Sequence, residues 1–245
     1  MINKFLLALQ FITAIPVKKE LDYKEEAIAN SMLFYPLIGS LLGAILAGVN
    51  YLAQLYLPNS VVNSLVIIFL IIITGGIHLD GLIDSSDGLF SGCKKDKILV
   101  IMRDSRVGAF GVVAVVVILL LKFNLLAELS EPYRIKTLIF FPTLARWAMV
   151  YAAFNYSYAR EEGLGIVYAQ NLSKTSFIIA TVWTILLAVV FFELKAIIIL
   201  FLSWCSLVLI INKIDDKLNG LTGDSYGAIN ELVEVIVLLI IIILM

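Results

Sequence analysis

Long runs of apolar residues alternate with short polar segments along most of the chain. A helix needs about 20 apolar residues to cross a bilayer, and seven runs come close to this length or exceed it. The runs cover residues 33–57, 61–78, 107–127, 135–156, 177–193, 195–212 and 228–245. This pattern predicts a single all-α domain over residues 1–245, a polytopic helical bundle in the membrane with about seven spans.

The segments around these runs predict how the bundle is completed. An apolar stretch at 5–15 is too short to cross, ends at Pro16 and lacks an Ala-x-Ala cleavage pattern. We therefore expect residues 1–32 to form an N-terminal interfacial region with a short helix, and not a signal peptide. The fifth and sixth runs nearly touch at 193–195, which predicts a tight turn between antiparallel helices.

The composition supports a membrane protein and excludes other classes. Hydrophobic residues make up 61% of the 245 residues and charged residues 15%, against about 45–50% and about 25% in soluble domains. A net charge of −1 argues against nucleic-acid binding, which needs clustered positive charge. Cys93 lies in a charged loop and Cys205 in an apolar run, so we expect both to be reduced.

The lysines and arginines predict the orientation, because positive loops stay on the cytoplasmic side. With a cytoplasmic N-terminus, most of the 18 positive residues fall in cytoplasmic segments, whereas Lys122 and Arg134 fall outside or at the outer boundary. This orientation places the polar segments 79–106, 157–176 and 212–227 on one face. We expect a multi-pass protein of the plasma (inner) membrane whose site faces the cytoplasm.

The most informative polar segment reads HLDGLIDSSDG at 78–88. The spacing of Asp80, Asp84 and Asp87 stacks three carboxylates on one helical face, where they repel one another. A divalent cation is the simplest compensation, and oxygen ligands suit magnesium or manganese. The alternative is a solvated helix end whose acids pair with Lys94, Lys95 and Arg103. The glycines beside the acids favour the metal site, because glycine permits close approach.

Two single residues stand out in or beside apolar runs. His78, the one histidine, is either a hydrogen-bonded structural group or a general base or positioning donor for catalysis. Arg146 lies well inside the fourth run, where an unpaired charge would cost at least about 2.5–3.5 kcal/mol. We expect Arg146 to face an aqueous or acidic pocket, with snorkelling to the interface as the alternative.

Two further segments offer groups that bind phosphate. Arg103 and Arg106 bracket Asp104 at a predicted helix start, where arginine forks and backbone N–H groups suit phosphate and Asp104 could cap the helix or bind metal. The alternative is that both arginines only anchor the topology. Arg160, in a glycine-rich turn, adds a weaker signal of the same kind.

The last polar segment combines a tight loop with acids inside the final run. Thr222 and Asp224, among several glycines, present polar groups before this run. Glu231 and Glu234 are three residues apart and share a helical face. Together with Arg146 they predict an intramembrane ionic network, the alternative being a boundary position from which they reach water.

These motifs, in this order, resemble the cobalamin synthase family, the membrane-bound adenosylcobinamide-GDP ribazoletransferases. The combination of motifs is highly specific and covers nearly the whole chain. The matching segments are FYPLIG at 34–39, HLDGLxDxxDG at 78–88, IMRDSRxGxxG at 101–111, residues 158–165 and TGDxxGA leading into Glu231 and Glu234. Ala14 stands where the family often has arginine, and Asn219 precedes Gly220 where it has a glycine pair.

The resemblance implies magnesium-dependent condensation of adenosylcobinamide-GDP with α-ribazole or its 5′-phosphate, giving adenosylcobalamin or its phosphate and GMP in cobalamin nucleotide-loop assembly. The partners would be these corrinoid and nucleoside substrates and the lipid bilayer. The expected site residues are His78, Asp80, Asp84 and Asp87 for catalysis; Asp80, Asp84, Asp87 and Asp104 or Asp224 for metal; Arg103, Arg106, Arg146 and Arg160 for phosphate; and Thr222, Asp224 and Glu231 as further site residues.

Two other functions remain compatible with the sequence. A CDP-alcohol-type membrane phosphotransferase shares part of the spaced-aspartate pattern. A cation-coupled transporter would use the acids and Arg146 as a translocation path. Such sites tend to lie near the bilayer midplane on broken helices, often with inverted repeats, whereas here the acids cluster at one face and no repeat is apparent. The preferred acceptor, the number of metals and the oligomeric state, a homo-oligomer included, are left open by the sequence.

Overall fold

The computed structural model describes the backbone of residues 1–245 and all side chains except that of Leu164. The described backbone is helical, and its one strand-like pairing is an isolated bridge between Tyr158 and Leu221. The all-α class is therefore confirmed. The helices are α1 (Ile2–Ile12), α2 (Glu25–Ser31), η1 (Met32–Phe34), α3 (Tyr35–Gln54), α4 (Asn59–Thr74), α5 (Ile77–Leu89), α6 (Lys95–Ile101), α7 (Ala109–Glu128), α8 (Tyr133–Asn155), α9 (Leu164–Asn171), α10 (Lys174–Phe192), α11 (Lys195–Leu218) and α12 (Gly223–Leu244).

Six helices are long and apolar enough to cross a membrane: the continuous stretch α2–η1–α3, and α7, α8, α10, α11 and α12. Helices α4 and α5 qualify only as a pair, bent by 88° at their junction. Each of the seven predicted runs coincides with one of these helices, but the run 61–78 is wrong at its end. The helix stops at Thr74 because Gly75 and Gly76 adopt φ values of 65° and 71°, which glycine tolerates at no steric cost.

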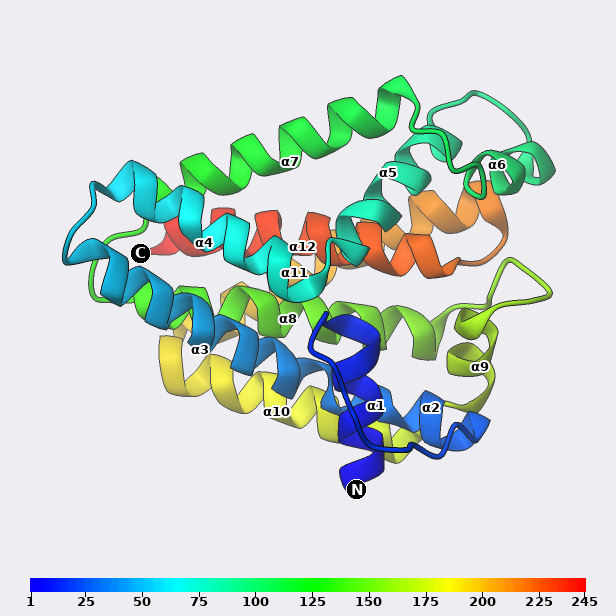
Figure 1. Cartoon of the computed structure of the whole chain (residues 1–245), viewed down its shortest axis with the longest axis horizontal. Helices are drawn as coiled ribbons and strands as arrows, with labels where there is room; N and C mark the ends of the chain where they lie inside the picture. Colours follow the sequence, from blue (N-terminus) through cyan, green and yellow to red (C-terminus); the bar gives the residue numbers. More distant parts are fainter.

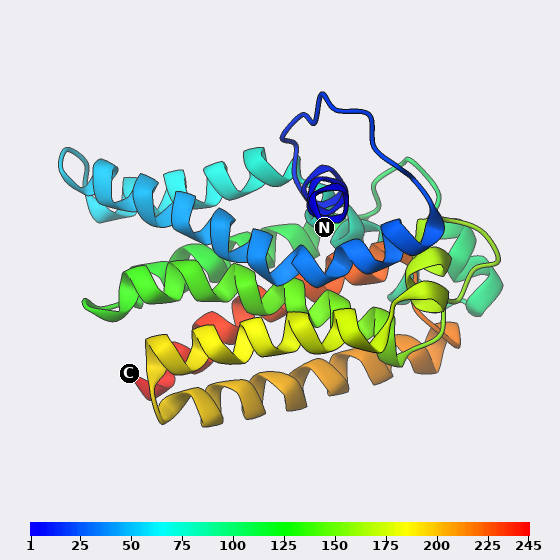
Figure 2. The same ribbon diagram turned by 90° about the horizontal axis from the view of Figure 1, so that it is seen from below.

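The long helices run side by side along the longest axis of the molecule, with α8 in the middle (Figure 1). Figure 2 shows α1 end-on, so this helix lies across the bundle. The predicted N-terminal helix is thus confirmed, while its place at the membrane interface stays a prediction. Buried residues make up 78% of the apolar window of α8 but 22% of that of α7, so α8 is a core helix and α7 is a peripheral one.

Helix α3 packs against α8 almost backbone to backbone. A Cβ atom on Gly39 would lie 2.5 Å from the Pro142 carbonyl oxygen, and one on Gly43 would lie 2.5 Å from Ile139 Cα. In lipid no hydrophobic driving force brings helices together, so they associate through close packing, which small residues at the crossing permit. This contact fixes the centre of the bundle.

The two ends of the bundle differ in what they carry. Helices α6 and α9 and the α11–α12 loop gather at one end, which we call the polar end, while the α3–α4, α7–α8 and α10–α11 connections and the C-terminus lie at the other (Figure 1). The three polar segments therefore converge, as the sequence predicts. The side of the membrane that the polar end faces stays a prediction.

Candidate active site

Helix α5 carries the three predicted acids, but they do not share one environment. The carboxylate of Asp87 accepts hydrogen bonds from the backbone N–H groups of Gly108 (2.7 Å) and Gly111 (2.8 Å). These groups belong to the first turn of α7, whose N–H groups have no partner within the helix. A Cβ atom on Gly111 would lie 2.6 Å from an Asp87 oxygen. Asp87 thus holds the N-terminus of α7 against α5.

Asp84 meets charges from a different element. The negative charges of Asp224 and Asp80 act on Asp84, and the positive charge of Arg160 partly offsets them. Arg160 donates a hydrogen bond to Asp224 at 2.8 Å. In the described structure the carboxylates of Asp80 and Asp84 have no hydrogen bond of their own. Acids from α5 and α12 and an arginine from the loop after α8 therefore meet at the polar end.

Close packing of α5 on α12 brings these acids together. A Cβ atom on Gly81 would lie 2.7 Å from the Asp224 carbonyl oxygen, and one on Gly227 would lie 3.2 Å from Gly81 Cα. The prediction that the glycines beside the acids mark close approaches is confirmed at Gly81. Only a residue without a side chain lets the two backbones come this near.

A short bridge brings Arg160 to Asp224. The backbone N–H of Ala159 donates to the Leu221 carbonyl, and that of Leu221 donates to the Ser157 carbonyl, both at 2.8 Å. The next residue, Thr222, is buried, and its side chain caps α12 by accepting from the Ser225 N–H at 3.1 Å. Thr222, expected as a site residue, therefore shapes the loop that presents Asp224.

Replacing Gly220 with alanine should break this bridge. Gly220 has a φ of 131°, and a Cβ atom there would lie 2.8 Å from the Ala159 nitrogen and 2.9 Å from the Ser157 oxygen. We expect Gly220→Ala to lower the free energy of unfolding by about 1–3 kcal/mol, the usual cost of such backbone strain, measured by thermal unfolding in detergent. Gly48→Ala is the control, since a Cβ there meets nothing within 4 Å. Equal melting temperatures for both variants would contradict the prediction.

The arginines after α6 lie at the same end. Arg106 and Asp104 form an exposed ion pair at 2.7 Å, and the hydrogen bonds from Arg106 lower the pKa of the Asp104 carboxyl to about 2. Arg103 is exposed, and its charge acts on Asp224. Arg103 and Arg160 therefore both approach Asp224, whereas Asp104, expected as a metal ligand, faces Arg106.

The acids of the described structure do not form a preassembled metal site. Across the described residues, no group of three or more His, Cys, Asp and Glu side chains is positioned to hold a metal ion. Asp87 is already bonded to backbone amides and Asp104 to Arg106. Asp80, Asp84 and Asp224 are the acids whose charges act on one another.

A buried ionic network crosses the middle of the bundle. Lys122 of α7 donates to Glu231 at 2.6 Å and to Glu234 at 2.5 Å, and Arg146 of α8 also pairs with Glu234. All four residues are at most 5% exposed. The predicted intramembrane network is confirmed, but the placement of Lys122 at the outer boundary is wrong, because its helix continues beyond it to Glu128.

Two residues of this network, Arg146 and Glu231, are also expected at the substrate site. Arg146 is fully enclosed and contacts Glu234, so it is not placed with the arginines that could bind phosphate. Glu231 pairs with Lys122 and does not lie with the acids of α5. Lys122 carries the same signal in the sequence as Arg146, a charge within an apolar run.

His78 touches this network from α5. Its Nδ1 lies 3.4 Å from an Arg146 Nη atom. A guanidinium can only donate, so Nδ1 accepts and the proton of the neutral ring lies on Nε2. His78 is 3% exposed, and its Nε2 has no hydrogen-bond partner in the described structure. In this tautomer His78 offers a hydrogen-bond donor at Nε2, while its part in catalysis stays a prediction.

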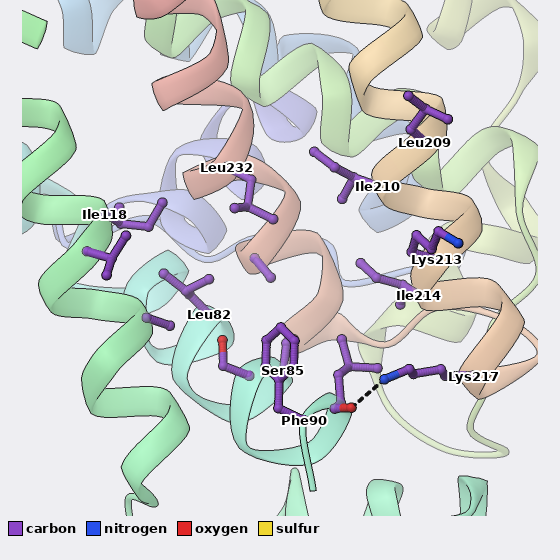
Figure 3. Close-up of a pocket in the computed structure, with 15 residues that line it drawn as sticks. Leu82, Ser85, Phe90, Ile118, Leu209, Ile210, Lys213, Ile214, Lys217 and Leu232 are labelled. Atoms are coloured by element: carbon purple, nitrogen blue, oxygen red, sulfur yellow. Dashed lines mark hydrogen bonds between the residues drawn. The ribbon is translucent and has the colours of Figure 1, made fainter. Parts of the chain in front are cut away.

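A large cavity lies on the other face of α5. It measures about 590 Å³ and opens between α5, α7, α11 and α12 (Figure 3). Its lining is mostly apolar and includes Leu82, Ile118 and Leu232, while Lys217 at one edge donates to the Leu89 carbonyl at 2.6 Å. The groove is lined almost entirely by hydrocarbon and carries charge only at Lys213 and Lys217, whereas the acids of the proposed site lie elsewhere, so size alone does not identify the site.

A smaller cavity of about 230 Å³ lies directly beside the acids. It is bordered by α1, α3, α5, α8, α9 and α12, and Asp80 and Asp224 form part of its wall. No motif or periodicity in the sequence indicates this cavity, because its residues come from six different helices.

The family of the chain is shown by comparison with known proteins. The family model described as Cobalamin-5-phosphate synthase matches residues 4–242. A Desulforamulus reducens protein named adenosylcobinamide-GDP ribazoletransferase is 39% identical over 98% of this chain and 96% of its own length. Proteins of the same name from Alkaliphilus metalliredigens (38%, over 95% and 92%) and Geotalea daltonii (36%, over 98% and 96%) agree. No solved structure matches. The chain belongs to the cobalamin-5-phosphate synthase family.

Proposed function

We propose that this protein is an adenosylcobinamide-GDP ribazoletransferase of cobalamin synthesis. It joins adenosylcobinamide-GDP to α-ribazole or α-ribazole 5′-phosphate and releases GMP. The family match over nearly the whole chain and the shared name of the relatives support the transferase reaction. The observation that carries the site is the meeting of Asp80, Asp84 and Asp224 with Arg160 at the polar end.

The donor set at this site suits a hard divalent cation. Asp80, Asp84 and Asp224 offer only carboxylate oxygens, which magnesium prefers, and their mutual repulsion would fall on binding it. Because the three side chains are not yet gathered around one point, we expect them to draw together on binding Mg²⁺, which would stabilise charge on the phosphate oxygens. Asp87 and Asp104 are less suited because their oxygens already accept hydrogen bonds.

The remaining steps fall to the side chains around the acids. Arg103 and Arg160 approach Asp224 from two loops, and their guanidinium groups would bind the diphosphate of the nucleotide. The carboxylate of Asp80 or Asp84 takes the proton of the attacking ribose hydroxyl. The hydroxyl oxygen bonds to the cobinamide-linked phosphorus while the bond from that phosphorus to the bridging oxygen breaks. GMP leaves with the bridging oxygen and its electron pair.

The same proposal includes the location of the site. Lysines and arginines gather in the segments of the polar end, and positive loops stay in the cytoplasm. We therefore expect the polar end to face the cytoplasm of a plasma-membrane protein. Labelling of Cys93, which lies just before α6 at this end, should occur in inside-out vesicles and not in intact cells. Labelling of Cys93 from outside intact cells would contradict this orientation and place the polar end on the external side.

The function is tested with purified protein in detergent, adenosylcobinamide-GDP and α-ribazole 5′-phosphate. With magnesium we expect GMP and the new corrinoid in equal amounts; EDTA should abolish both, and excess magnesium should restore them. CDP-diacylglycerol with inositol is the control substrate pair and should give no product. Folded protein that forms neither GMP nor corrinoid would contradict the transferase, whereas full activity in EDTA would contradict only the metal.

A further inference from the structure

The smaller cavity beside the acids has a wall of aromatic rings. Phe11, Tyr35, Tyr168 and Tyr226 all border it, and Asp80 and Asp224 stand at the same cavity. The rings are held in place: Tyr35 and Tyr168 share a hydrogen bond between their hydroxyls at 3.2 Å, and Phe11 meets Tyr168 edge to face. Such a wall suits a flat aromatic molecule of modest size.

Two polar atoms of the cavity residues lack a partner within the described structure. These are Nε2 of His78 and the hydroxyl of Tyr226, and each residue is 3% exposed. A buried polar group without a hydrogen bond is unfavourable, which points to a ligand atom that completes it. Because Nδ1 of His78 accepts from Arg146, Nε2 carries the proton. The missing partner of His78 is therefore an acceptor.

We infer that this cavity binds the aromatic base of the acceptor nucleoside, with His78 Nε2–H donating to an unprotonated ring nitrogen. The inference rests on the proposed function and names the subsite for one of its substrates. A bicyclic base with one free ring nitrogen brings apolar faces to the aromatic wall and one acceptor to His78 Nε2–H. Its ribose then lies toward Asp80 and Asp224, where the attacking hydroxyl is needed.

The other parts of the substrates match the cavity less well. A corrin macrocycle is larger than the drug-sized ligands that occupy cavities of about 300–1,000 Å³, and this cavity measures about 230 Å³. Guanine carries two N–H donor groups and a carbonyl on one edge, more polar atoms than the two partnerless groups of the wall can satisfy.

The test compares two acceptors: α-ribazole, and its analogue in which an indole C–H replaces the free ring nitrogen. Kinetics are measured with each substrate varied in turn. For the wild type we expect a KM for the indole analogue about tenfold above that for α-ribazole, the effect of about one hydrogen bond. In His78→Phe this ratio should fall to about one, while the KM for adenosylcobinamide-GDP stays unchanged.

Two further variants keep the inference testable if His78→Phe does not fold. Met149 lines the cavity, so Met149→Ala enlarges the cavity and should favour acceptors with bulkier bases. Tyr226→Phe should raise the KM of the acceptor and leave that of adenosylcobinamide-GDP unchanged. Tyr51→Phe, at an exposed position on α3, is the control and should change neither KM.

The results separate this inference from the proposed function. Wild-type turnover with an unchanged acceptor preference in all folded cavity variants would overturn the inference alone. A change confined to the KM for adenosylcobinamide-GDP would assign the cavity to the nucleotide and also overturn it. Calorimetric binding of α-ribazole that is lost in Tyr226→Phe, without any wild-type turnover, would support the inference and contradict the proposed function.

Discussion

Asp84→Asn is expected to lower kcat by about 10²–10⁴-fold, the usual range for a lost acid–base or charge-bearing group, without loss of the fold. Asp84 is partly exposed on α5, and the charges of Asp224 and Asp80 act on it. Asparagine has the same shape but carries no charge. The substitution removes like-charge repulsion, so the melting temperature should stay equal or rise slightly. A group kept at a cost to stability is typical of a functional site.

The measurement pairs the rate of GMP release with thermal unfolding in the same detergent. Asp216→Asn is the matched control, because Asp216 is exposed on α11, and both its rate and its melting temperature should match the wild type. Near-normal magnesium-dependent turnover in Asp84→Asn would remove Asp84 from the proposed mechanism. A large fall in the melting temperature would instead assign this residue a structural role.

The positions of the membrane helices could be predicted, because lipid forces every crossing segment to satisfy its backbone internally. The break after Thr74 could not. The apolar pattern continues through Gly75 and Gly76 to Ile77, and only the positive φ of the two glycines turns the chain. That turn removes His78 from the span and makes it part of the helix that carries the acids.

The candidate site was predictable only within one helix. The spacing of Asp80, Asp84 and Asp87 correctly places all three on α5, because helical periodicity is local. It does not indicate that Asp87 binds the N-terminus of α7, or that Arg160 reaches Asp224, 64 positions further along the chain. Those contacts depend on packing between helices and on the bridge before α12, which no periodicity reports.

The buried network could be predicted only in part, because the distribution of charges along the sequence does not identify their partners. The positive-inside rule treats a lysine as a marker of side and says nothing about its partner, so it assigns Lys122 to the outer boundary. Glu231 and Glu234 taken alone also fit a boundary. Only the packing of α7 and α8 against α12 shows that two cations and two acids neutralise one another.

Glu234→Ala should therefore destabilise the protein more strongly than Gly220→Ala does. Glu234 pairs with both Lys122 and Arg146, and its removal leaves Arg146 without an acidic partner in a fully buried position. Breaking a buried pair in this way costs about 3–5 kcal/mol. We expect little monodisperse protein in detergent and a strongly lowered melting temperature. Glu128→Ala, at the exposed end of α7, should change neither.

A double variant distinguishes charge balance from packing as the cause. Lys122→Met alone leaves Glu231 buried without its cation, whereas Lys122→Met with Glu231→Gln removes one charge of each sign and keeps the pair of Arg146 and Glu234. The double variant should therefore unfold at a higher temperature than Lys122→Met alone, since replacing a whole buried ion pair is often nearly neutral. A double variant that unfolded at the same temperature as Lys122→Met, or at a lower one, would contradict this. The network would then contribute through side-chain volume, and charge compensation would not be what holds α7 and α8 to α12.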